Sequence, residues 1–115
     1  MAAAITFAPT TLNELQTRLR SFCENHPIEK LEVFGSVAKE TANEESDIDL
    51  LATFSPDIPT GFAYFGFVQT MEEELADLLG CDVDLLDRES VERTRNPIRR
   101  NEILGRAIAI YERGA

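Results

Sequence analysis

Three aspartates and a glycine-serine pair are the residues of this chain whose types and spacing could support a reaction. Asp47 and Asp49 stand two positions apart in a strand-like stretch, so their side chains are expected on one face, about 7 Å apart. Gly35 and Ser36 precede them, with ten intervening residues, and Asp84 lies in a later strand-like stretch. Carboxylates delivered by two neighbouring strands could hold a hard divalent cation without imidazole or thiolate ligands.

The glycine-serine pair has the features of a phosphate-binding turn. Gly35 and Ser36 stand where a strand is expected to pass into a helical turn, and that junction exposes backbone amides and the positive end of a short helix. Glycine allows a phosphate to approach the backbone, and serine adds a hydroxyl donor. A triphosphate at one end of the site and Mg²⁺ at the other suit attack of a hydroxyl on the α-phosphorus of a nucleoside triphosphate, with pyrophosphate leaving.

Other interpretations of the aspartate pair are simpler or fit less well. Asp47 and Asp49 could belong to a solvated strand face. A calcium-binding EF-hand is disfavoured, because its fifth and sixth loop positions would be Leu51 and Ala52, which supply neither an oxygen ligand nor a glycine. A glycosyltransferase Asp-x-Asp motif fits the metal but not a chain of this size.

Two further charged groups also have simple alternatives. Asp84 could be a strand-edge carboxylate, and Asp82, on the same face, could be the ligand instead. A basic stretch follows, and we interpret it as a solvated helix entry, the alternative being that part of its charge faces the triphosphate or a partner. Its arginines are Arg93, Arg95, Arg99 and Arg100.

The elements that must position these residues alternate between helix and strand. A capping box at Thr11–Glu14 opens a helix that ends near Asn25, and Asn96-Pro97 opens another that ends near Gly105. The remaining expected elements are strands over 28–34, 47–54, 82–86 and 107–111, a helical turn from Ser36 to Lys39, a loop over 55–61 and a helix over 62–79 that stops at Gly80. This order predicts an α/β (α+β) domain with a small mixed β-sheet flanked by helices.

Apolar periodicity identifies the helix faces that should be buried. The first helix has a stripe made of Leu12, Leu15, Leu19 and Phe22, and the 62–79 helix has one made of Phe65, Val68, Met71, Leu75, Leu78 and Leu79. We assign the aromatic cluster of Phe62, Tyr64, Phe65 and Phe67 to core packing, an adenine platform or docking surface being the alternative. His26 is expected in a loop, without a role.

Length and charge limit the classes of protein. The chain has 115 residues and a net charge of −10, which suits one domain over residues 1–115 and argues against nucleic acid or an anionic membrane as the main partner. Cys23 and Cys81 are far apart, without metal-binding spacing, so we expect buried, reduced thiols in a cytoplasmic protein. The apolar start lacks the basic residues of a signal peptide, and no later stretch is long and apolar enough to span a membrane.

On these motifs the chain resembles the minimal nucleotidyltransferase domains of the DNA polymerase β superfamily. The resemblance covers nearly the whole chain and rests on Gly35-Ser36, on the stretches 47–51 and 79–86, and on the ending from Asn96 to Glu112. It implies a polymerase-β-like nucleotidyltransferase fold. By position, it implies metal binding and catalysis by Asp47, Asp49 and Asp84, and nucleotide contact by Gly35, Ser36 and Lys39.

The family resemblance also implies a function, a substrate and a partner. Many stand-alone members are antitoxins of HEPN-type ribonuclease toxins, which they inhibit by transferring AMP from ATP to a toxin tyrosine. The implied ligands are therefore ATP, Mg²⁺ and a toxin bound in a hetero-oligomer, without direct nucleic-acid binding. The alternative is a non-catalytic acidic antitoxin that neutralises the toxin by binding alone. A small-molecule acceptor such as an antibiotic fits less well, because no second domain is available to bind it.

The glycine-serine motif departs from the family pattern at its end. Family members often read Gly-Ser-x-Ala-Arg-Gly, whereas Lys39 and Glu40 replace the Arg-Gly here. Lysine keeps the positive charge but loses the two-pronged geometry of arginine, so a changed grip on the triphosphate is expected. The alternative for Lys39 is an ordinary surface lysine.

Overall fold

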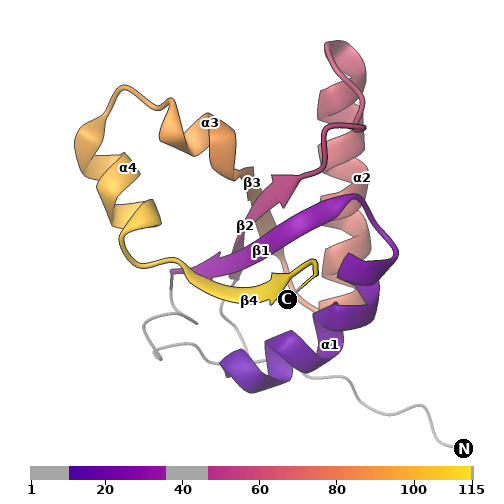
Figure 1. The fold of residues 1–115 in the computed structure, drawn as a ribbon. Helices are drawn as coiled ribbons and strands as arrows, with labels where there is room; N and C mark the ends of the chain where they lie inside the picture. Colours follow the sequence, from indigo (N-terminus) through magenta and orange to yellow (C-terminus); the bar gives the residue numbers. More distant parts are fainter. Residues whose placement is uncertain (1–10, 36–46, 115) are drawn as a thin grey trace, which may run out of the picture.

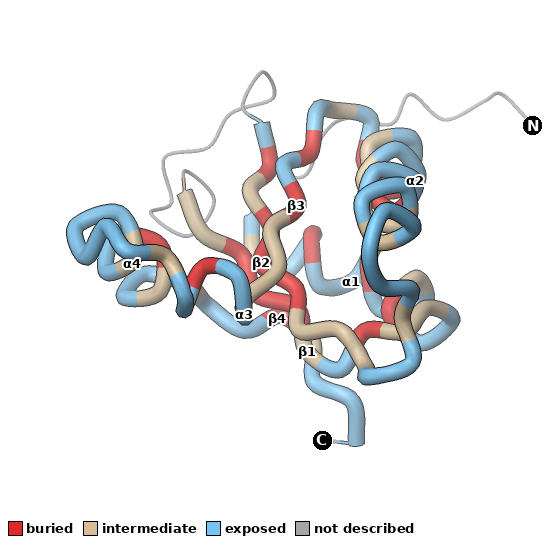
Figure 2. The backbone as a smooth tube through the Cα atoms, turned by 90° about the horizontal axis from the view of Figure 1, so that it is seen from above, coloured by how far each residue is buried: buried red, intermediate tan, exposed pale blue. Residues whose placement is uncertain are grey.

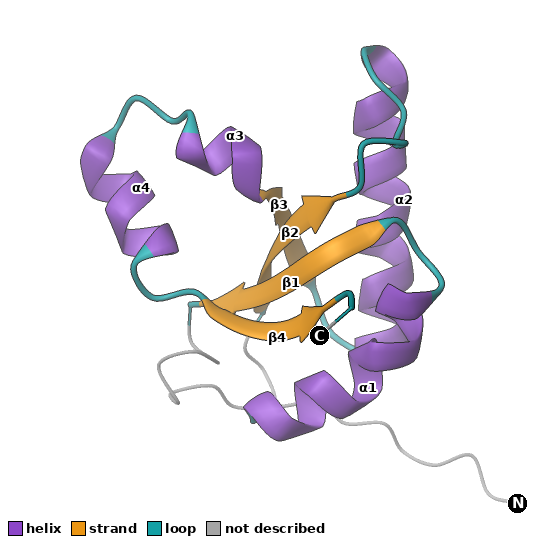
Figure 3. Cartoon of the chain, in the orientation of Figure 1, coloured by secondary structure: helices purple, strands orange, loops and turns teal. Residues whose placement is uncertain are grey.

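The described part of the chain folds into four helices and four strands, in the order that the alternating pattern predicts apart from one added helix. A computed structural model describes residues 11–35 and 47–114 (Figure 1, Figure 3). Its elements are α1 (Leu12–Glu24), β1 (Ile28–Phe34), β2 (Ile48–Phe54), α2 (Phe62–Leu79), β3 (Val83–Asp87), α3 (Arg88–Glu92), α4 (Pro97–Leu104) and β4 (Ile108–Glu112). The helical turn predicted from Ser36 to Lys39 lies outside the described residues.

The four strands form one mixed sheet in the order β3-β2-β1-β4. β1 pairs antiparallel with both β2 and β4, whereas β2 and β3 run parallel and are joined through α2. The α/β class with a small mixed sheet flanked by helices is therefore confirmed. In the parallel pair, residues at the start of β2 stand beside residues at the start of β3, and this register assembles the site described below.

The two faces of the sheet are covered by different helices. α1 and α2 pack on one face, and α3 and α4 lie on the other (Figure 1, Figure 2). Side chains of a strand alternate between faces, so Ile48 and Leu50 enter the main core while Leu51 joins a smaller core with Val91 and Ile103. Asp49 shares the face of Leu51. The aspartates therefore lie on the face that α3 and α4 cover.

Local sequence signals set the ends of most helices as predicted. The backbone amide of Glu14 donates to the Thr11 hydroxyl at 3.2 Å at the start of α1. The Asn96 side chain caps α4 by accepting from the backbone amides of Ile98 and Arg99. Gly80 ends α2 in the left-handed conformation, with φ of 73°. The added helix α3 begins where the Asp87 carboxylate accepts from the amide of Glu89.

The expected burial of the aromatic cluster is wrong for two of its members. Phe62 is 96% exposed and Phe65 69% exposed. The predicted buried face of α2 also fails at Leu78, which is 42% exposed. The physical reason at the two phenylalanines is visible in Figure 1, where the first turns of α2 extend beyond the sheet and have no strand to pack against. Phe67, two residues after Phe65, does pack, with its ring centroid 5.4 Å from that of Phe54.

Residues that are far apart in the sequence make contacts that join the ends of helices and strands. The His26 ring lies 2.7 Å from the Phe22 carbonyl oxygen through Nδ1 and 2.9 Å from the Glu74 carboxylate through Nε2, so this residue connects α1 to α2. Arg113 donates to the carbonyl oxygens of Cys23 and His26 and ties the end of the chain to the end of α1. His26 thus has a structural role that its sequence position did not indicate.

Both cysteines are free thiols, as expected. Cys23 is buried, and burial raises the pKa of its thiol to about 12, which makes it a poor nucleophile at neutral pH. Cys81 is half-buried rather than buried. In the part of the chain that the structure describes, none of the helices combines the length and the apolarity needed to cross a bilayer.

Candidate active site

The start of β2 brings two of the three predicted aspartates together. Asp49 is the direct partner of Asp84 across the parallel β2–β3 pair, and Phe34 is its partner across the antiparallel β1–β2 pair. Partners in a ladder project to the same face, with about 5 Å between their α-carbons. Asp84 lies on β3, which is an edge strand, so the alternative of a strand-edge carboxylate stays open. The register nevertheless sets Asp84 next to Asp49.

Asp82 and Asp84 stand beside different members of the aspartate pair. Asp82 precedes β3, and its carbonyl oxygen accepts from the amide of Ile48 at 3.0 Å. Continuing the β2–β3 register by one residue sets Asp82 beside Asp47, whereas Asp84 is the direct partner of Asp49. The choice of Asp84 by the family pattern is compatible with this register and stays a prediction.

Gly35 follows β1 immediately and meets the carboxylate of Asp49. Its φ of +72° lies in the left-handed region that favours glycine. A Cβ atom at this position would collide with Oδ2 of Asp49. The sequence argument assigned this glycine to the approach of a phosphate, whereas the structure shows a second requirement, the approach of an aspartate from the neighbouring strand.

A cavity of about 280 Å³ opens above these residues. Its sheet side is formed by Gly35, Asp49 and Asp84 together with the half-buried ring of Phe34. Its other side is formed by α4 and the residues that follow it. The lining residues from that side are Arg99, Glu102, Ile103 and Arg106. The cavity therefore joins a carboxylate floor to a wall that carries both signs of charge.

The carboxylates at this end of the sheet repel one another. The pKa of Asp49 is raised, first because the side chain is partly desolvated and then because Asp84 and Asp47 add negative potential. Asp47 therefore lies within electrostatic range of Asp49, although it is exposed and does not line the cavity. The Asp49 carboxylate forms no hydrogen bond or ion pair with another described residue. A cation between these carboxylates would relieve their repulsion.

The carboxylates offer the donor chemistry of a Mg²⁺ site, although not a finished set of ligands. All three supply hard oxygen donors, which Mg²⁺ prefers, and two of them stand in register on adjacent strands. Among residues 11–35 and 47–114, no group of three or more His, Cys, Asp or Glu side chains is gathered closely enough to hold a metal ion. The three-aspartate metal site therefore stays a prediction.

Part of the predicted nucleotide site lies outside the described residues. Gly35 is described, but Ser36, Lys39 and Glu40 are not. Their roles in triphosphate binding stay predictions, as does the effect of the Lys39-Glu40 departure from the family pattern.

Sequence reasoning offered Arg99 near the triphosphate only as an alternative and missed the rest of the wall that α4 supplies to the cavity. Ile103 is 7% exposed and anchors α4 in the smaller core beside Leu51 and Val91. Arg99, Glu102 and Arg106 are spaced at positions i, i+3 and i+7 on the side of Ile103. The signal that could have found them is this spacing around Ile103, the buried apolar residue of α4.

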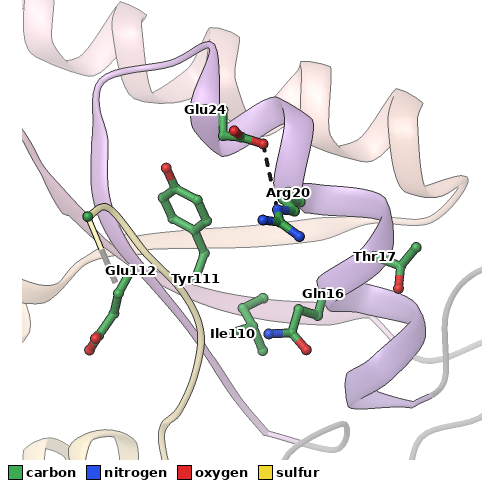
Figure 4. A pocket seen from close by; sticks show the side chains of 8 residues that line it. Gln16, Thr17, Arg20, Glu24, Ile110, Tyr111 and Glu112 are labelled. Carbon is green, nitrogen blue, oxygen red and sulfur yellow. Dashed lines mark ion pairs between the residues drawn. The ribbon is translucent and has the colours of Figure 1, made fainter.

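Two larger cavities lie away from the aspartates. One, of about 580 Å³, lies between α1 and β4, and Figure 4 shows Tyr111 and Ile110 of β4 opposite the Arg20–Glu24 ion pair of α1. The other, of about 770 Å³, lies at the far end of the sheet, between the 53–61 segment, α2 and α3. Neither is lined by Asp47, Asp49 or Asp84, so size alone does not identify the site of chemistry here.

Comparison with known proteins gives consistent matches in sequence and structure. The family model described as "Nucleotidyltransferase domain" matches residues 15–112. The protein adenylyltransferase MntA of Thermococcus cleftensis is 34% identical over 88 residues, which is 73% of this chain and 84% of that protein. An inferred protein adenylyltransferase of Methanocaldococcus jannaschii is 28% identical over 99 residues, which is 86% of this chain and 97% of that protein.

Solved structures show the same fold. The structure of an inferred minimal nucleotidyltransferase is 31% identical, has a TM-score of 0.61 and is matched over 84% of this chain and 90% of that one. A toxin–antitoxin structure determined with AMP-PNP is 22% identical, with a TM-score of 0.57 over 88% of this chain and 73% of that one. At that identity, the second match supports the fold alone.

Proposed function

This chain belongs to the nucleotidyltransferase domain family, and we propose that it transfers AMP from ATP to a hydroxyl group of a partner protein. The observation that carries the proposal is the register of Asp49 with Asp84 beside Gly35, at one cavity. Relatives named protein adenylyltransferases support a protein as acceptor.

The proposed reaction assigns a task to each site residue. The acceptor oxygen bonds to the α-phosphorus, the bond from that phosphorus to the bridging oxygen of the β-phosphate breaks, and pyrophosphate leaves. Asp84 takes part in removing the proton of the acceptor hydroxyl. Asp47 and Asp49 would hold two Mg²⁺ ions, one of them shared with Asp84, and these ions would stabilise charge on the attacking and leaving oxygens.

Nucleotide binding completes the proposed site. Gly35 and Ser36 would seat the β- and γ-phosphates through backbone amides and a hydroxyl, and Lys39 would add a positive charge to the triphosphate. The family resemblance supports these three assignments, and the position of Gly35 at the cavity supports the first of them.

The proposed partner is a HEPN-type ribonuclease toxin, and the proposed acceptor is one of its tyrosines. The resemblance to antitoxin nucleotidyltransferases supports this choice. The relative named protein adenylyltransferase MntA supports a protein as the acceptor. The pair would form a hetero-oligomer in the cytoplasm, where ATP is available and where the free Cys23 and Cys81 would stay reduced.

A second candidate is an antitoxin that neutralises its toxin by binding alone. The exposed Phe62 and Phe65 favour it, because exposed aromatic side chains are common in protein–protein contacts. In that case the nucleotide site would be idle or regulatory, and inhibition would not need ATP.

One experiment separates these candidates. The protein encoded beside this chain is purified, mixed with it in the presence or absence of ATP and Mg²⁺, and analysed by intact-mass spectrometry and by a ribonuclease assay. We expect a mass gain of about 329 Da for each AMP transferred, together with loss of ribonuclease activity. Inhibition without a mass change would refute the enzyme and support binding alone.

A variant pair shows whether the transfer uses the proposed site. Asp49→Ala should abolish the mass gain while the far-ultraviolet circular dichroism stays unchanged. Asp57→Ala, in the exposed loop after β2, is the matched control and should transfer AMP at the wild-type rate. Undiminished transfer by Asp49→Ala would remove the site assignment.

A further inference from the structure

The cavity wall opposite the aspartates carries two arginines that the proposed reaction has not used. Arg99 and Arg106 line the same cavity as Gly35, Asp49 and Asp84. They come from α4 and the turn that follows it, whereas the aspartates come from β2 and β3. The site is thus built from the sheet and from the helix layer that covers it. The residues that the family resemblance implies lie on the sheet side, and the arginines lie on the helix side.

The position of these arginines is fixed by packing rather than by their own contacts. Ile103 is buried in the smaller core and sets the rotation of α4 on the sheet. Arg99 lies one turn before Ile103 and Arg106 follows the end of the helix, so both flank the buried side chain on its cavity side. Both are exposed, and neither guanidinium group has a hydrogen bond or ion pair with another described residue.

Glu102 is the one acidic residue on this wall. It stands three residues after Arg99 and four before Arg106, a spacing at which helical side chains can pair. No ion pair within 4 Å joins it to either arginine. The two guanidinium groups are therefore available to a ligand in the cavity.

Charge determines which kind of ligand suits such a cavity. The floor repels anions through Asp49 and Asp84, and the wall attracts them through two guanidinium groups. A ligand that bridges both needs phosphate oxygens near the wall and a cation between it and the floor. A nucleotide bound with a divalent cation has this arrangement, because the phosphorus that reacts must lie beside the cation ligands.

We propose that Arg99 and Arg106 bind the oxygens of the transferred α-phosphate from the side opposite the aspartates. The proposal rests on the proposed function and adds to it a second set of nucleotide-binding residues. Gly35 and Ser36 remain assigned to the β- and γ-phosphates. Two arginines on the α-phosphate would also balance charge that develops on its oxygens during transfer.

Nucleotide binding, measured by NMR titration, tests the proposal without needing a partner protein. Wild type, Arg99→Ala and Arg106→Ala are titrated with ATP, AMP and pyrophosphate, each in Mg²⁺. We expect each variant to raise the dissociation constant for ATP and for AMP about tenfold and to leave that for pyrophosphate unchanged. Arg99→Lys should recover part of the loss, because it keeps the charge without the two-pronged geometry.

Two further variants make the expected result specific. Arg95→Ala removes the same charge from the same basic stretch, but this residue does not line the cavity, so nucleotide binding should not change. Glu102→Gln removes the negative charge from the wall and should tighten ATP and AMP binding by about two- to threefold. Urea denaturation of each variant shows whether the fold is retained.

Two outcomes would overturn the proposal. Weaker binding of pyrophosphate and ATP with unchanged AMP would assign the arginines to the leaving group. Unchanged nucleotide binding with weaker binding of the partner protein would assign them to the interface. Wild-type protein that binds ATP but modifies no partner would refute the proposed activity while the comparison of variants in nucleotide binding still stands.

Discussion

Two carboxylates on the same face of the sheet have opposite electrostatic surroundings. Glu32 on β1 is 5% exposed and accepts from Arg88 at 2.6 Å, and Arg88 also donates to Glu92 at 3.1 Å. Asp49 on the adjacent β2 is partly buried, and the charges that raise the pKa of its carboxyl are the negative charges of Asp84 and Asp47. The first arrangement serves stability, whereas the second leaves a charge that a ligand must balance.

The difference shows how this small domain separates structure from function. A buried charge normally needs a partner, because desolvation costs several kcal/mol. At Glu32 the partner is built in, and the hydrogen bond to Glu32 raises the pKa of Arg88. At Asp49 burial and like charges raise the pKa of the carboxyl. Perturbed groups in a cavity, without a built-in partner, are typical of functional sites.

The largest expected effect follows from removing the charge of Asp49. Asp49→Asn should lower the rate of AMP transfer on the order of a thousandfold, because the residue is proposed to hold the ions that stabilise the reacting oxygens. The same change should increase the free energy of unfolding in EDTA by about 0.5–1 kcal/mol, because it removes a charge from a repulsive cluster, partly screened by solvent. Transfer assays and urea denaturation measure the two effects.

Asp57→Asn is the matched control for both readouts. It is an exposed aspartate in the loop after β2 and should change neither transfer nor stability. If Asp49→Asn lowered the free energy of unfolding instead of raising it, Asp49 would be a structural carboxylate like Glu32.

The reverse effect is expected at the other carboxylate. Arg88→Met leaves Glu32 buried without a partner and should lower the free energy of unfolding by about 3 kcal/mol, since Arg88 itself is partly exposed. Nucleotide binding should not change. Urea denaturation followed by circular dichroism measures the loss.

A double variant and a variant of an exposed ion pair test whether desolvation of Glu32 causes the loss of stability in Arg88→Met. Glu32→Met combined with Arg88→Met should recover most of the stability, because apolar residues replace the whole buried pair. Arg20→Met removes an exposed pair, with Glu24 at 3.8 Å, and should cost less than about 0.5 kcal/mol. If the double variant were as unstable as Arg88→Met, desolvation of Glu32 would not be the cause.

A third prediction concerns the glycine beside the site. Gly35→Ala should cost about 2 kcal/mol of stability, because alanine is strained at φ of +72° and its Cβ would displace the Asp49 carboxylate. In an Asp49→Ala background the cost should fall by about 1 kcal/mol, since that carboxylate is gone. A double-mutant cycle by urea denaturation gives this difference.

Gly61→Ala provides the control cycle. Gly61 also has a positive φ, of 66°, but a Cβ there would meet no atom within 4 Å. Its cost should be the same with or without Asp49. Equal costs for Gly35→Ala in both backgrounds would mean that Asp49 does not require this glycine.

The sequence predicted the part of the site that depends on local patterns. Alternation in β2 assigned Asp49 to the face opposite Ile48 and Leu50, and the structure agrees. Family spacing singled out Asp84, which the strand register then sets beside Asp49. The face of Asp49 was predictable because strand alternation is a short-range property of the chain, whereas the role of Asp84 stays a prediction.

The rest depends on contacts between distant residues. Glu32 and Arg88 are 56 positions apart, and no local pattern connects them. α3 has five residues, too few for helical periodicity to be visible. For Phe62 and Phe65, periodicity identifies a helix face but not whether a strand lies beneath it. Arg99 and Arg106 reach the cavity because Ile103 fixes α4 in a core that forms from three separate elements.

The smallest expected effect is the pH dependence of the stability that Asp49→Asn gains. Because the folded state raises the pKa of Asp49 above its unfolded value, protonation of this carboxyl favours folding. The penalty of its charge is full at pH values above the raised pKa and disappears below the ordinary aspartate pKa. In EDTA, the advantage of Asp49→Asn over wild type should therefore be largest at pH 7 and shrink as the pH falls through that window. Urea denaturation across the window measures this advantage, which should stay below about 1 kcal/mol. An advantage that grew on acidification would mean that Asp49 has a stabilising partner in the folded state, as Glu32 has, and the contrast between the two carboxylates would be lost.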